Sequence, residues 1–375
     1  MLFLASTPLF LATARADWTS LLNASPSEAV KANIQFPLES KWQIDPDGYW
    51  GFRSSPAVYK NTVYVGSMTG RFYAVDGVTG KEKWHANLPD RVEFSSPAVD
   101  DTGVYVGCED GHLYAFGHDG KELWKIPTGA KIECSPIAVN SRVYVGNKEG
   151  LLVCVDSVQG RKVWEKKCDG PVFARPTVVG DAVYIGTEGF QGGTLYALNT
   201  ENGKELFTPF KCGSIPGHEK AAGAIYSSVL HARGRLYFGS MDGSLYCLDA
   251  KSGTRVWTRE FEKGISGSPA MAGKILVIGV QDRNWYGINA TDGSILWKRS
   301  TDRYYPSLRS PVIVNSTVLV QYEYKLLALN LVDGEKVFDF QFTPEDGPAD
   351  GPAVAVSGER LYICTRFKLV CFAAK

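Results

Sequence analysis

Histidine, cysteine and ionisable side chains are the groups from which this chain could build a catalytic or metal site. Its histidines are spread along the sequence, and no two have the spacing of a metal-binding pair: His85, His112, His118, His218 and His231. The 8 cysteines contain no C-x-x-C pattern, which leaves zinc and thioredoxin-type chemistry without support. No nucleophile, base and orienting acid can be assigned as a set. These residue types therefore favour binding over catalysis.

A repeat of about 40 residues must position those side chains. Its clearest copy joins Ser268-Pro269-Ala270, residues 276–279, residues 285–289 and a turn at Asp292-Gly293. An aromatic residue closes each copy, at Trp42, Trp84, Trp124, Trp164, Phe207, Trp257, Trp297 and Phe338. Four short alternating segments in a unit of this length predict an all-β protein, a β-propeller of four-stranded antiparallel blades.

Tight turns divide each copy into hairpins. In residues 236–257, Asp242-Gly243 closes one hairpin and Ser252-Gly253 the next, because such pairs tolerate the positive φ of tight turns. We predict eight inner strands, at Ser55-Pro56-Ala57, Ser96-Pro97-Ala98, Ser135-Pro136-Ile137, Arg175-Pro176-Thr177, Ser228-Val229, Ser268-Pro269-Ala270, Ser310-Pro311-Val312 and Gly351-Pro352-Ala353. The repeat therefore predicts eight blades.

The two ends of the repeat complement each other. The last copy reaches Lys375 without an outer strand, whereas Ser40-Lys41-Trp42-Gln43 is an outer strand with no blade before it. We expect the strand around Trp42 to complete the final blade, so that no sheet edge is left open between the termini. This organisation gives a single eight-bladed propeller over residues 39–375.

The residues before the propeller favour export to the periplasm or the exterior. Residues 1–16 combine an apolar run with Ala14-Arg15-Ala16, a pattern that predicts a signal peptide and its cleavage site. No Lys or Arg precedes the run, so an upstream start codon stays open, and a retained segment would mean a cytoplasmic protein. No cysteine follows closely enough to predict a lipid anchor. In the extension over residues 17–38, Ser25, Pro26 and Glu28 predict a short helix.

Composition limits the partners. Lys plus Arg equals Asp plus Glu at 40 each, so no net basic field attracts nucleic acid or an anionic membrane. No apolar stretch after residue 20 is long enough to span a bilayer.

The cysteines fall into two groups. Five replace small packed residues of other copies, whereas Cys134, Cys168 and Cys212 lie near loops, and their pairing stays open. We expect a monomer.

Residues 113–124 and 245–257 resemble the repeat of quinoprotein propellers, which bind pyrroloquinoline quinone, and of their non-catalytic relatives. The resemblance spans roughly residues 40–375. In size the chain is similar to the non-catalytic propeller subunit of the bacterial outer-membrane barrel-assembly machinery. In this family each outer-strand tryptophan docks on the neighbouring blade, a structural role that the resemblance implies for Trp42, Trp84, Trp124, Trp164, Trp257 and Trp297.

The resemblance also allows an enzyme hypothesis to be weighed. Quinoprotein dehydrogenases carry an adjacent Cys-Cys pair, a Ca²⁺ ion, a catalytic Asp and large insertions between blades. This chain has no Cys-Cys dipeptide and one enlarged joint, residues 208–226. We therefore expect no cofactor, neither the quinone nor Ca²⁺. A quinone-dependent oxidoreductase or a small-ligand protein remains the alternative, with Trp50 and Trp285 as stacking surfaces, although Trp285 aligns with the core residue Leu245.

Binding residues are expected on the face that carries the joints between blades, and around its central funnel. Aromatic and arginine side chains are frequent interface anchors, although packing between blades is an equal alternative for each of them. The candidates are Trp50, Phe52, Arg53, Arg175, Phe190, His218, Glu219, Lys220, Tyr304, Tyr305, Arg309, Tyr322 and Tyr324.

Mixed charges are expected near the axis, at Arg53, Glu93, Glu133, Arg175, Arg309 and Asp350. They predict either a mutually neutralising ring or, as the second interpretation, a site for a polar ligand. The sequence as a whole predicts an exported, non-catalytic scaffold that binds a protein or a polysaccharide through the loop face.

Overall fold

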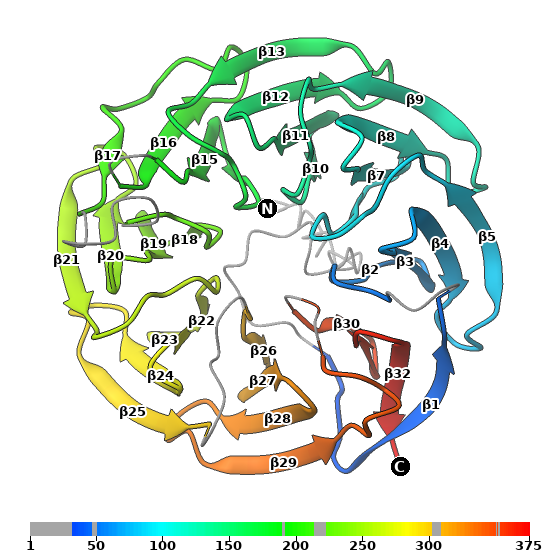
Figure 1. Ribbon diagram of the computed structural model, residues 1–375. Coiled ribbons are helices and arrows are strands. Elements are labelled where there is room, and N and C mark those ends of the chain that lie inside the picture. Colours follow the sequence, from blue (N-terminus) through cyan, green and yellow to red (C-terminus); the bar gives the residue numbers. More distant parts are fainter. Residues whose placement is uncertain are drawn as a thin grey trace, which may run out of the picture.

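The computed structural model describes residues 32–46, 51–189, 192–213, 223–301, 309–349, 351 and 353–375. Within these ranges the chain forms eight four-stranded antiparallel sheets and no α-helix. The sheets are arranged as blades around one axis (Figure 1). The predicted eight-bladed all-β propeller is therefore confirmed. The signal segment and the helix expected around Ser25 lie outside the described residues.

The two inner strands of each blade are mostly buried because neighbouring blades cover both of their faces. The innermost strands are β2 (Ala57–Tyr59), β6 (Ala98–Val99), β10 (Ile137–Val139), β14 (Thr177–Val179), β18 (Leu230–Ala232), β22 (Ala270–Ala272), β26 (Val312–Val314) and β30 (Ala355–Ser357). The second strands are β3 (Thr62–Gly66), β7 (Val104–Gly107), β11 (Arg142–Gly146), β15 (Ala182–Gly186), β19 (Arg235–Gly239), β23 (Ile275–Val280), β27 (Thr317–Tyr322) and β31 (Arg360–Cys364).

The third strands are also largely buried, whereas the outer strands alternate exposed and packed side chains. The third strands are β4 (Arg71–Asp76), β8 (His112–Phe116), β12 (Leu151–Asp156), β16 (Thr194–Asn199), β20 (Ser244–Asp249), β24 (Asn284–Asn289), β28 (Lys325–Asn330) and β32 (Leu369–Ala374). The outer strands are β5 (Glu82–Asn87), β9 (Glu122–Pro127), β13 (Lys162–Lys167), β17 (Phe210–Lys211), β21 (Arg255–Glu260), β25 (Ile295–Ser300), β29 (Lys336–Gln341) and β1 (Leu38–Ile44).

The eighth blade joins the two ends of the chain. Its strand order is β1-β32-β31-β30, and β1 pairs antiparallel with β32 so that Trp42 faces Cys371 and Ile44 faces Leu369. In Figure 1 the blue strand β1 lies beside the red strand β32. The predicted closure by the strand around Trp42 is confirmed. No blade is left with three strands.

The structure corrects the predicted inner strand of this blade. Ala355 of β30 pairs with Tyr362 as Ala57 of β2 pairs with Tyr64, so Ala353 occupies the position of Ser55. The expected strand at Gly351-Pro352-Ala353 was therefore two residues early. The Gly-Pro dipeptide resembles the Ser-Pro of other copies, but pairing with β31 sets the register.

The hydrophobic core lies between blades. Each buried cluster draws on neighbouring sheets: Val58 and Tyr73 of blade 1 pack with Tyr362 and Leu369 of blade 8. Each blade therefore depends on its neighbours to bury its faces, which is the usual condition in repeat architectures.

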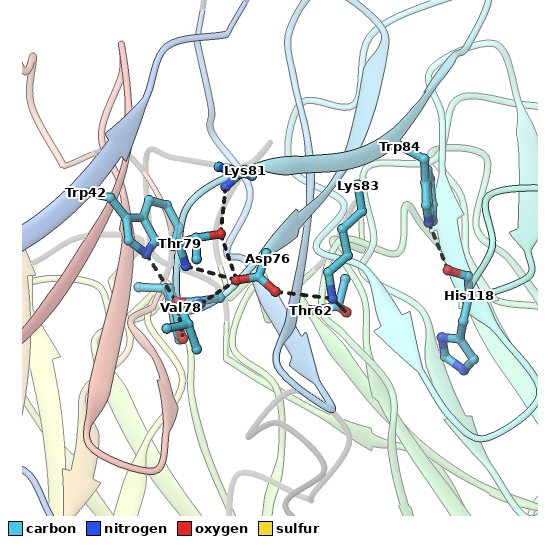
Figure 2. A network of polar contacts seen from close by, with 11 residues as sticks. Trp42, Thr62, Asp76, Val78, Thr79, Lys81, Lys83, Trp84 and His118 are labelled. Atoms are coloured by element: carbon cyan, nitrogen blue, oxygen red, sulfur yellow. Dashed lines mark hydrogen bonds and ion pairs between the residues drawn. The ribbon is translucent and has the colours of Figure 1, made fainter.

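The outer-strand tryptophans bind the next blade around the ring. Trp42 donates a hydrogen bond from Nε1 to the carbonyl of Gly77, and Trp84 donates one to the carbonyl of His118 (Figure 2). The six indoles donate over 2.8–3.2 Å to the carbonyls of Gly77, His118, Ser157, Thr200, Ala290 and Leu331. Each of these carbonyls lies in the segment between the third and fourth strands, so every contact joins equivalent parts of successive blades.

Glycine and small residues make room for these indoles. Gly334 has φ +71°, and a Cβ there would come within 2.6 Å of the ring of Trp297. On the other side, Gly287 faces Trp297 across the sheet, and its Cβ would lie 2.2 Å from the indole nitrogen. Cysteine fills the corresponding position at Cys154, Cys247 and Cys371, which explains three of the buried thiols.

Phe338 has a different partner because blade 8 has no covalent turn between its third and fourth strands. Its ring packs on Phe36, with ring centroids 5.2 Å apart, and Phe36 directly precedes the cis Phe36-Pro37 peptide before β1. The segment that leads into the closing strand therefore takes the place of the glycine turn.

In six of the eight blades the turn that follows the third strand is held by the last side chain of that strand, which is Asp76, Asp156, Asn199, Asp249, Asn289 or Asn330. Asp76 accepts hydrogen bonds at Oδ1 from the backbone N–H groups of Val78 (3.1 Å) and Thr79 (2.9 Å) (Figure 2). These bonds, led by that from Thr79, lower the pKa of Asp76 because they favour the charged form. The turn thereby presents the carbonyl of Gly77 to Trp42.

We predict that Trp297→Ala lowers the free energy of unfolding by about 3–5 kcal/mol, because the side chain is buried and its loss leaves a cavity between blades 6 and 7. Trp297→Phe should cost clearly less, since Phe207 and Phe338 serve at equivalent positions and one net hydrogen bond contributes about 1 kcal/mol. Urea unfolding of both variants measures the difference. Equal losses would mean that the indole hydrogen bond, rather than packing, dominates the docking.

Candidate functional site

The two faces of the ring are built differently. The joints between blades and the turns between second and third strands share one face, which we call the joint face. At blades 1 and 2, for example, Leu88 N donates to the carbonyl of Gly70 (2.8 Å) and Val92 N to that of Ser67 (3.0 Å). The remaining turns lie on the opposite face, which we call the turn face. The long connections therefore gather on the joint face, where loops commonly carry function.

The inner strands begin at a ring of mostly serine residues around the axis, which we call the serine collar. Its members lie two positions before each inner strand: Ser55, Ser96, Ser135, Arg175, Ser228, Ser268, Ser310 and Ala353. At five of these positions the backbone N–H donates over 2.8–2.9 Å to the hydroxyl of the next member. The collar thus links successive blades near the axis, as the tryptophans link them at the rim.

Arg175 interrupts the collar. It stands where a serine would offer its hydroxyl to the backbone N–H of Ser135. Among the described residues its Nε and Nη2 atoms have no hydrogen-bond partner, and both atoms are shut off from solvent. Burial disfavours the charged form and lowers the pKa of Arg175 to about 10, so the group still carries its charge at neutral pH. Two of the three guanidinium nitrogens of Arg175 are therefore enclosed beside the central channel without a hydrogen-bond partner in the described structure.

Two cavities meet at the collar. The one towards the joint face has a volume of about 250 Å³ and includes Arg53, Glu133 and Tyr226 in its lining. The one towards the turn face has about 140 Å³ and is mainly apolar, with Ile137 and Met271 in its wall. Both share the same five collar residues: Ser135, Arg175, Ser228, Ser268 and Ser310. Arg175 therefore borders both halves of the channel.

The mouth of the channel is aromatic and charged. Phe94 is 38% exposed there, and the ring of Phe173 packs on Tyr226 with centroids 5.6 Å apart. Arg53 pairs with Glu93 at 2.5 Å, and burial raises the pKa of that carboxyl above its ordinary value.

Sequence reasoning missed Phe94 and Phe173. Both lie two residues before a collar residue, and so do Arg53, Glu133, Tyr226 and Ser266. Because side chains alternate along an extended segment, this spacing places all of them on the channel side. Comparison of that position across the copies would have found the mouth.

Several expected binding residues are instead part of the core. Phe52 is 0% exposed and Tyr322 only 7%, and both belong to clusters between blades, so neither presents a surface to a partner. Tyr324 is half-buried against the cluster of blades 7 and 8. Trp285 is fully buried, in agreement with its alignment to a core position and not with a stacking surface.

Three expected residues lie at the channel. Arg53, Arg175 and Arg309 all line the cavity on the joint side, and Arg309 also donates to the carbonyl of Gly351 at 3.3 Å. Seven other candidates and one axial charge lie outside the described residues: Trp50, Phe190, His218, Glu219, Lys220, Tyr304, Tyr305 and Asp350. The channel residues that the sequence and the structure share are therefore the three arginines and Glu133.

The described residues offer few side chains suited to metal binding or nucleophilic catalysis. In the described part of the chain no group of three or more His, Cys, Asp and Glu side chains is placed to hold a metal ion. All eight cysteines are buried and unpaired, and burial raises the pKa of Cys134 and Cys168 to about 12, which keeps them as unreactive thiols. No helix in the described ranges is long and apolar enough to cross a membrane.

The blade repeat, the docking tryptophans and the collar define an eight-bladed propeller of the PQQ-like repeat class. The chain belongs to the family described as outer membrane protein assembly factor BamB, whose model matches residues 18–139, 118–216 and 216–375. A relative of that name from Burkholderia pseudomallei is 26% identical over 335 residues, which cover 83% of this chain and 81% of the relative. The expected resemblance is thus confirmed.

Solved structures agree on the fold. The crystal structure of BamB from Moraxella catarrhalis superposes with a TM-score of 0.76 at 18% identity, covering 90% of this chain and all of that one. A quinohemoprotein alcohol dehydrogenase from Comamonas testosteroni gives a TM-score of 0.78 at 13% identity, covering 96% of this chain and 81% of that one. An assembly factor and an enzyme are equally similar in shape, so the shape does not decide between their functions.

We predict that Arg175→Ser raises the free energy of unfolding by about 1 kcal/mol or more. The change removes a buried charge without a partner and supplies a hydroxyl for the backbone N–H of Ser135, a bond worth about 1 kcal/mol net. Arg175→Ala is the matched control, because it removes the charge without supplying the hydroxyl. Urea unfolding should rank serine above alanine. A serine variant less stable than the parent would show that packing of the arginine stem outweighs both effects.

Proposed function

We propose that this protein is an exported, non-catalytic scaffold that assists the assembly of outer membrane proteins by binding another protein through its joint face. The observation that carries the proposal is the family match, which extends over residues 18–375. The match therefore includes the whole propeller and is not confined to a few blades. The function for which these relatives are named, outer membrane protein assembly, is proposed for this chain on that basis.

The partner protein is proposed to bind at the rim of the channel on the joint face. Phe94 is exposed there without a ring partner in the described structure, and Arg91 and Lys131 are exposed nearby on the same joints. Aromatic and arginine side chains are enriched in protein interfaces. The predicted contacts in the enlarged joint, residues 208–226, belong to the same proposal. A polysaccharide would be the less favoured ligand, since the family name refers to proteins.

The proposed location is the periplasmic side of the outer membrane. The apolar run and the Ala14-Arg15-Ala16 pattern support a cleaved signal peptide. All eight cysteines are free and buried, so none is exposed to an oxidising compartment. We also propose a monomer, because the ring closes on itself and leaves only outer strands as edges.

No quinone or calcium site is proposed, because the residues present do not fit one. The dehydrogenase pattern needs a Cys-Cys pair, and the sequence has none. Calcium prefers six to eight oxygen ligands including carboxylates. At the mouth, however, the described carboxylates are engaged: Glu93 pairs with Arg53, and Glu133 pairs with Lys148 at 2.9 Å.

Removal of the gene from the parent bacterium should lower the amount of folded barrel proteins in the outer membrane, and the unchanged gene should restore it. We predict that Phe94→Ser, on the joint face, restores it poorly, whereas Val158→Ser, 63% exposed on the turn face, restores it fully. Both sites are exposed, so stability should change by only about 0.5 kcal/mol. Heat-modifiability of barrel proteins on gels measures folding. Unchanged barrel proteins after gene removal would refute the assembly function.

Calorimetric titration with pyrroloquinoline quinone and Ca²⁺ tests the enzyme alternative directly. We predict no saturable heat for the purified exported protein. A complex of one quinone per chain, with micromolar or tighter affinity, would replace the scaffold proposal with the quinoprotein alternative. The experiment is informative whatever the partner of the joint face is, since it probes only the channel.

A further inference from the structure

Residues 32–37, which lead into β1, cross the turn face of the ring between its axis and its rim. At the inner end, Asn315 in the turn after β26 donates from Nδ2 to the carbonyl of Ala32 over 2.7 Å. The backbone N–H of the next residue donates over 3.3 Å to the carbonyl of Gly358, in the turn after β30. At the outer end, Phe36 packs on the outer strand β29. In Figure 1 the blue segment ahead of β1 accordingly runs from between β26 and β30 to the rim. Followed backwards from β1, the chain therefore heads for the axis.

Ala32, where the described chain begins, lies beside the wall of the turn-side cavity. It is buried, and it belongs to the hydrophobic cluster that contains Val312 and Val354. The same two valines line the cavity of about 140 Å³. The residues that precede Ala32 in the chain therefore start at the edge of this cavity.

The turn-side cavity suits apolar side chains. Ile137, Pro269 and Met271 are part of its wall, in addition to the two valines. Its volume is roughly ten times the 10–15 Å³ that one water needs, which leaves room for aliphatic side chains. An empty apolar cavity destabilises a protein, because the atoms around it lose packing partners. A hydrophobic occupant would therefore stabilise the inner ends of the blades.

The chain ahead of Ala32 contains such an occupant. The predicted cleavage after Ala16 leaves residues 17–31, in which Leu21 and Leu22 form an adjacent aliphatic pair. Removal of leucine side chains from water into an apolar cavity is favourable. The segment therefore carries side chains of the kind that the cavity accepts.

The length of the segment is sufficient. The inner strands β2 and β30 have Cα atoms within 8 Å of each other, and a ring of eight strands at this spacing has a radius of about 10 Å. Residues 23–31 span about 14 Å even as a helix, at about 1.5 Å per residue. Leu22 can therefore reach the axis from the position of Ala32.

The other ranges that the structure leaves undescribed belong to the joint side of the ring. They connect elements whose described ends lie on the joint face: residues 47–50, 190–191, 214–222 and 302–308, and the single residues 350 and 352. Residues 17–31 are therefore the part of the exported chain that is attached next to the turn-side cavity.

We propose that residues 17–31 dock on the turn-side mouth of the channel, with Leu21 and Leu22 anchored in its apolar cavity. The docked segment closes the turn side, so that the channel opens only on the joint face. Because the segment is tethered to its own ring, its effective concentration at this site is about millimolar, which favours it over the segment of a second copy. The site lies opposite the protein-binding surface proposed above and does not depend on it.

Methionine methyl NMR with a spin label tests the docking in the exported protein. Residues 17–375 contain three methionines: Met271 in the cavity wall, and Met68 and Met241 in turns of the joint face. A spin label can be attached selectively to the variant Ser20→Cys, because the eight native cysteines are buried. We expect the label to broaden the methyl signal of Met271 and to leave those of Met68 and Met241 sharp. Absence of broadening at Met271 would overturn the proposal.

Variants of the labelled protein test the two anchors. Leu21→Asp combined with Leu22→Asp should reduce the paramagnetic broadening at Met271 at least about threefold, because the docked form becomes the minor one. Thr19→Asp combined with Asn23→Asp is the matched control, since it adds the same charge to the same segment and keeps both leucines. This control should broaden Met271 as the parent does. Unchanged broadening in the leucine variant, or an equal loss in the control, would refute the role of the leucines. The two joint-face methionines report in each case that the ring is folded.

A mixed sample separates docking within one chain from docking between copies. Spin-labelled protein without the methyl label is mixed with methyl-labelled protein without the spin label, at about 0.1 mM each, below the effective concentration of the tethered segment. We expect no broadening at Met271 in this mixture. Broadening as strong as in the doubly labelled chain would replace self-docking with docking of the segment of a second copy.

Discussion

The docking of each outer-strand aromatic ring on the next blade is the contact on which the rest of the ring depends. A blade alone leaves both faces of its sheet uncovered, and the indole joins two blades by packing and by a hydrogen bond to a turn carbonyl. Trp257 and Tyr237 donate to the same carbonyl, that of Ala290, so a single acceptor is fully used. Burial raises the pKa of Tyr237 to about 12, which keeps its hydroxyl a donor. The demand for one such contact per blade explains the period of the sequence.

That contact restricts other positions in turn. The turn that receives the ring needs glycine at positive φ, and the residue facing the ring across the sheet must be small, as Gly287 and Cys247 are. The cysteines opposite a tryptophan, Cys154, Cys247 and Cys371, are therefore consequences of packing, and burial raises the pKa of each of them. Where the chain ends interrupt the pattern, Phe36 takes over the role of the missing turn.

The inner end of each blade is held by a second, smaller device, the serine collar. Serine is well suited to this place, because it accepts a hydrogen bond from the adjacent blade and leaves the axis open. The collar has two departures, and they differ in kind. Ala353 only removes an acceptor, whereas Arg175 introduces a charge at the meeting point of two cavities. A departure that loses stability without a local gain is where function is most usefully sought. The same reasoning explains why shape alone, shared with both an assembly factor and a dehydrogenase, says little about activity.

The sequence by itself determined the number of blades, the closing role of Trp42 and the family, because a forty-residue period, turn glycines and aromatic positions are local signals that repeat. It also placed Arg53, Arg175 and Arg309 at the channel. Tertiary structure decided which aromatic residues are exposed: Phe52 and Tyr322 are buried, and Phe94 reaches solvent. It also set the register of β30 and showed that Glu93 and Glu133 are paired while two guanidinium nitrogens of Arg175 have no partner in the described structure. These properties depend on which side chains from different blades meet. The spacing of residues along the chain does not say which of them come close together in the folded ring.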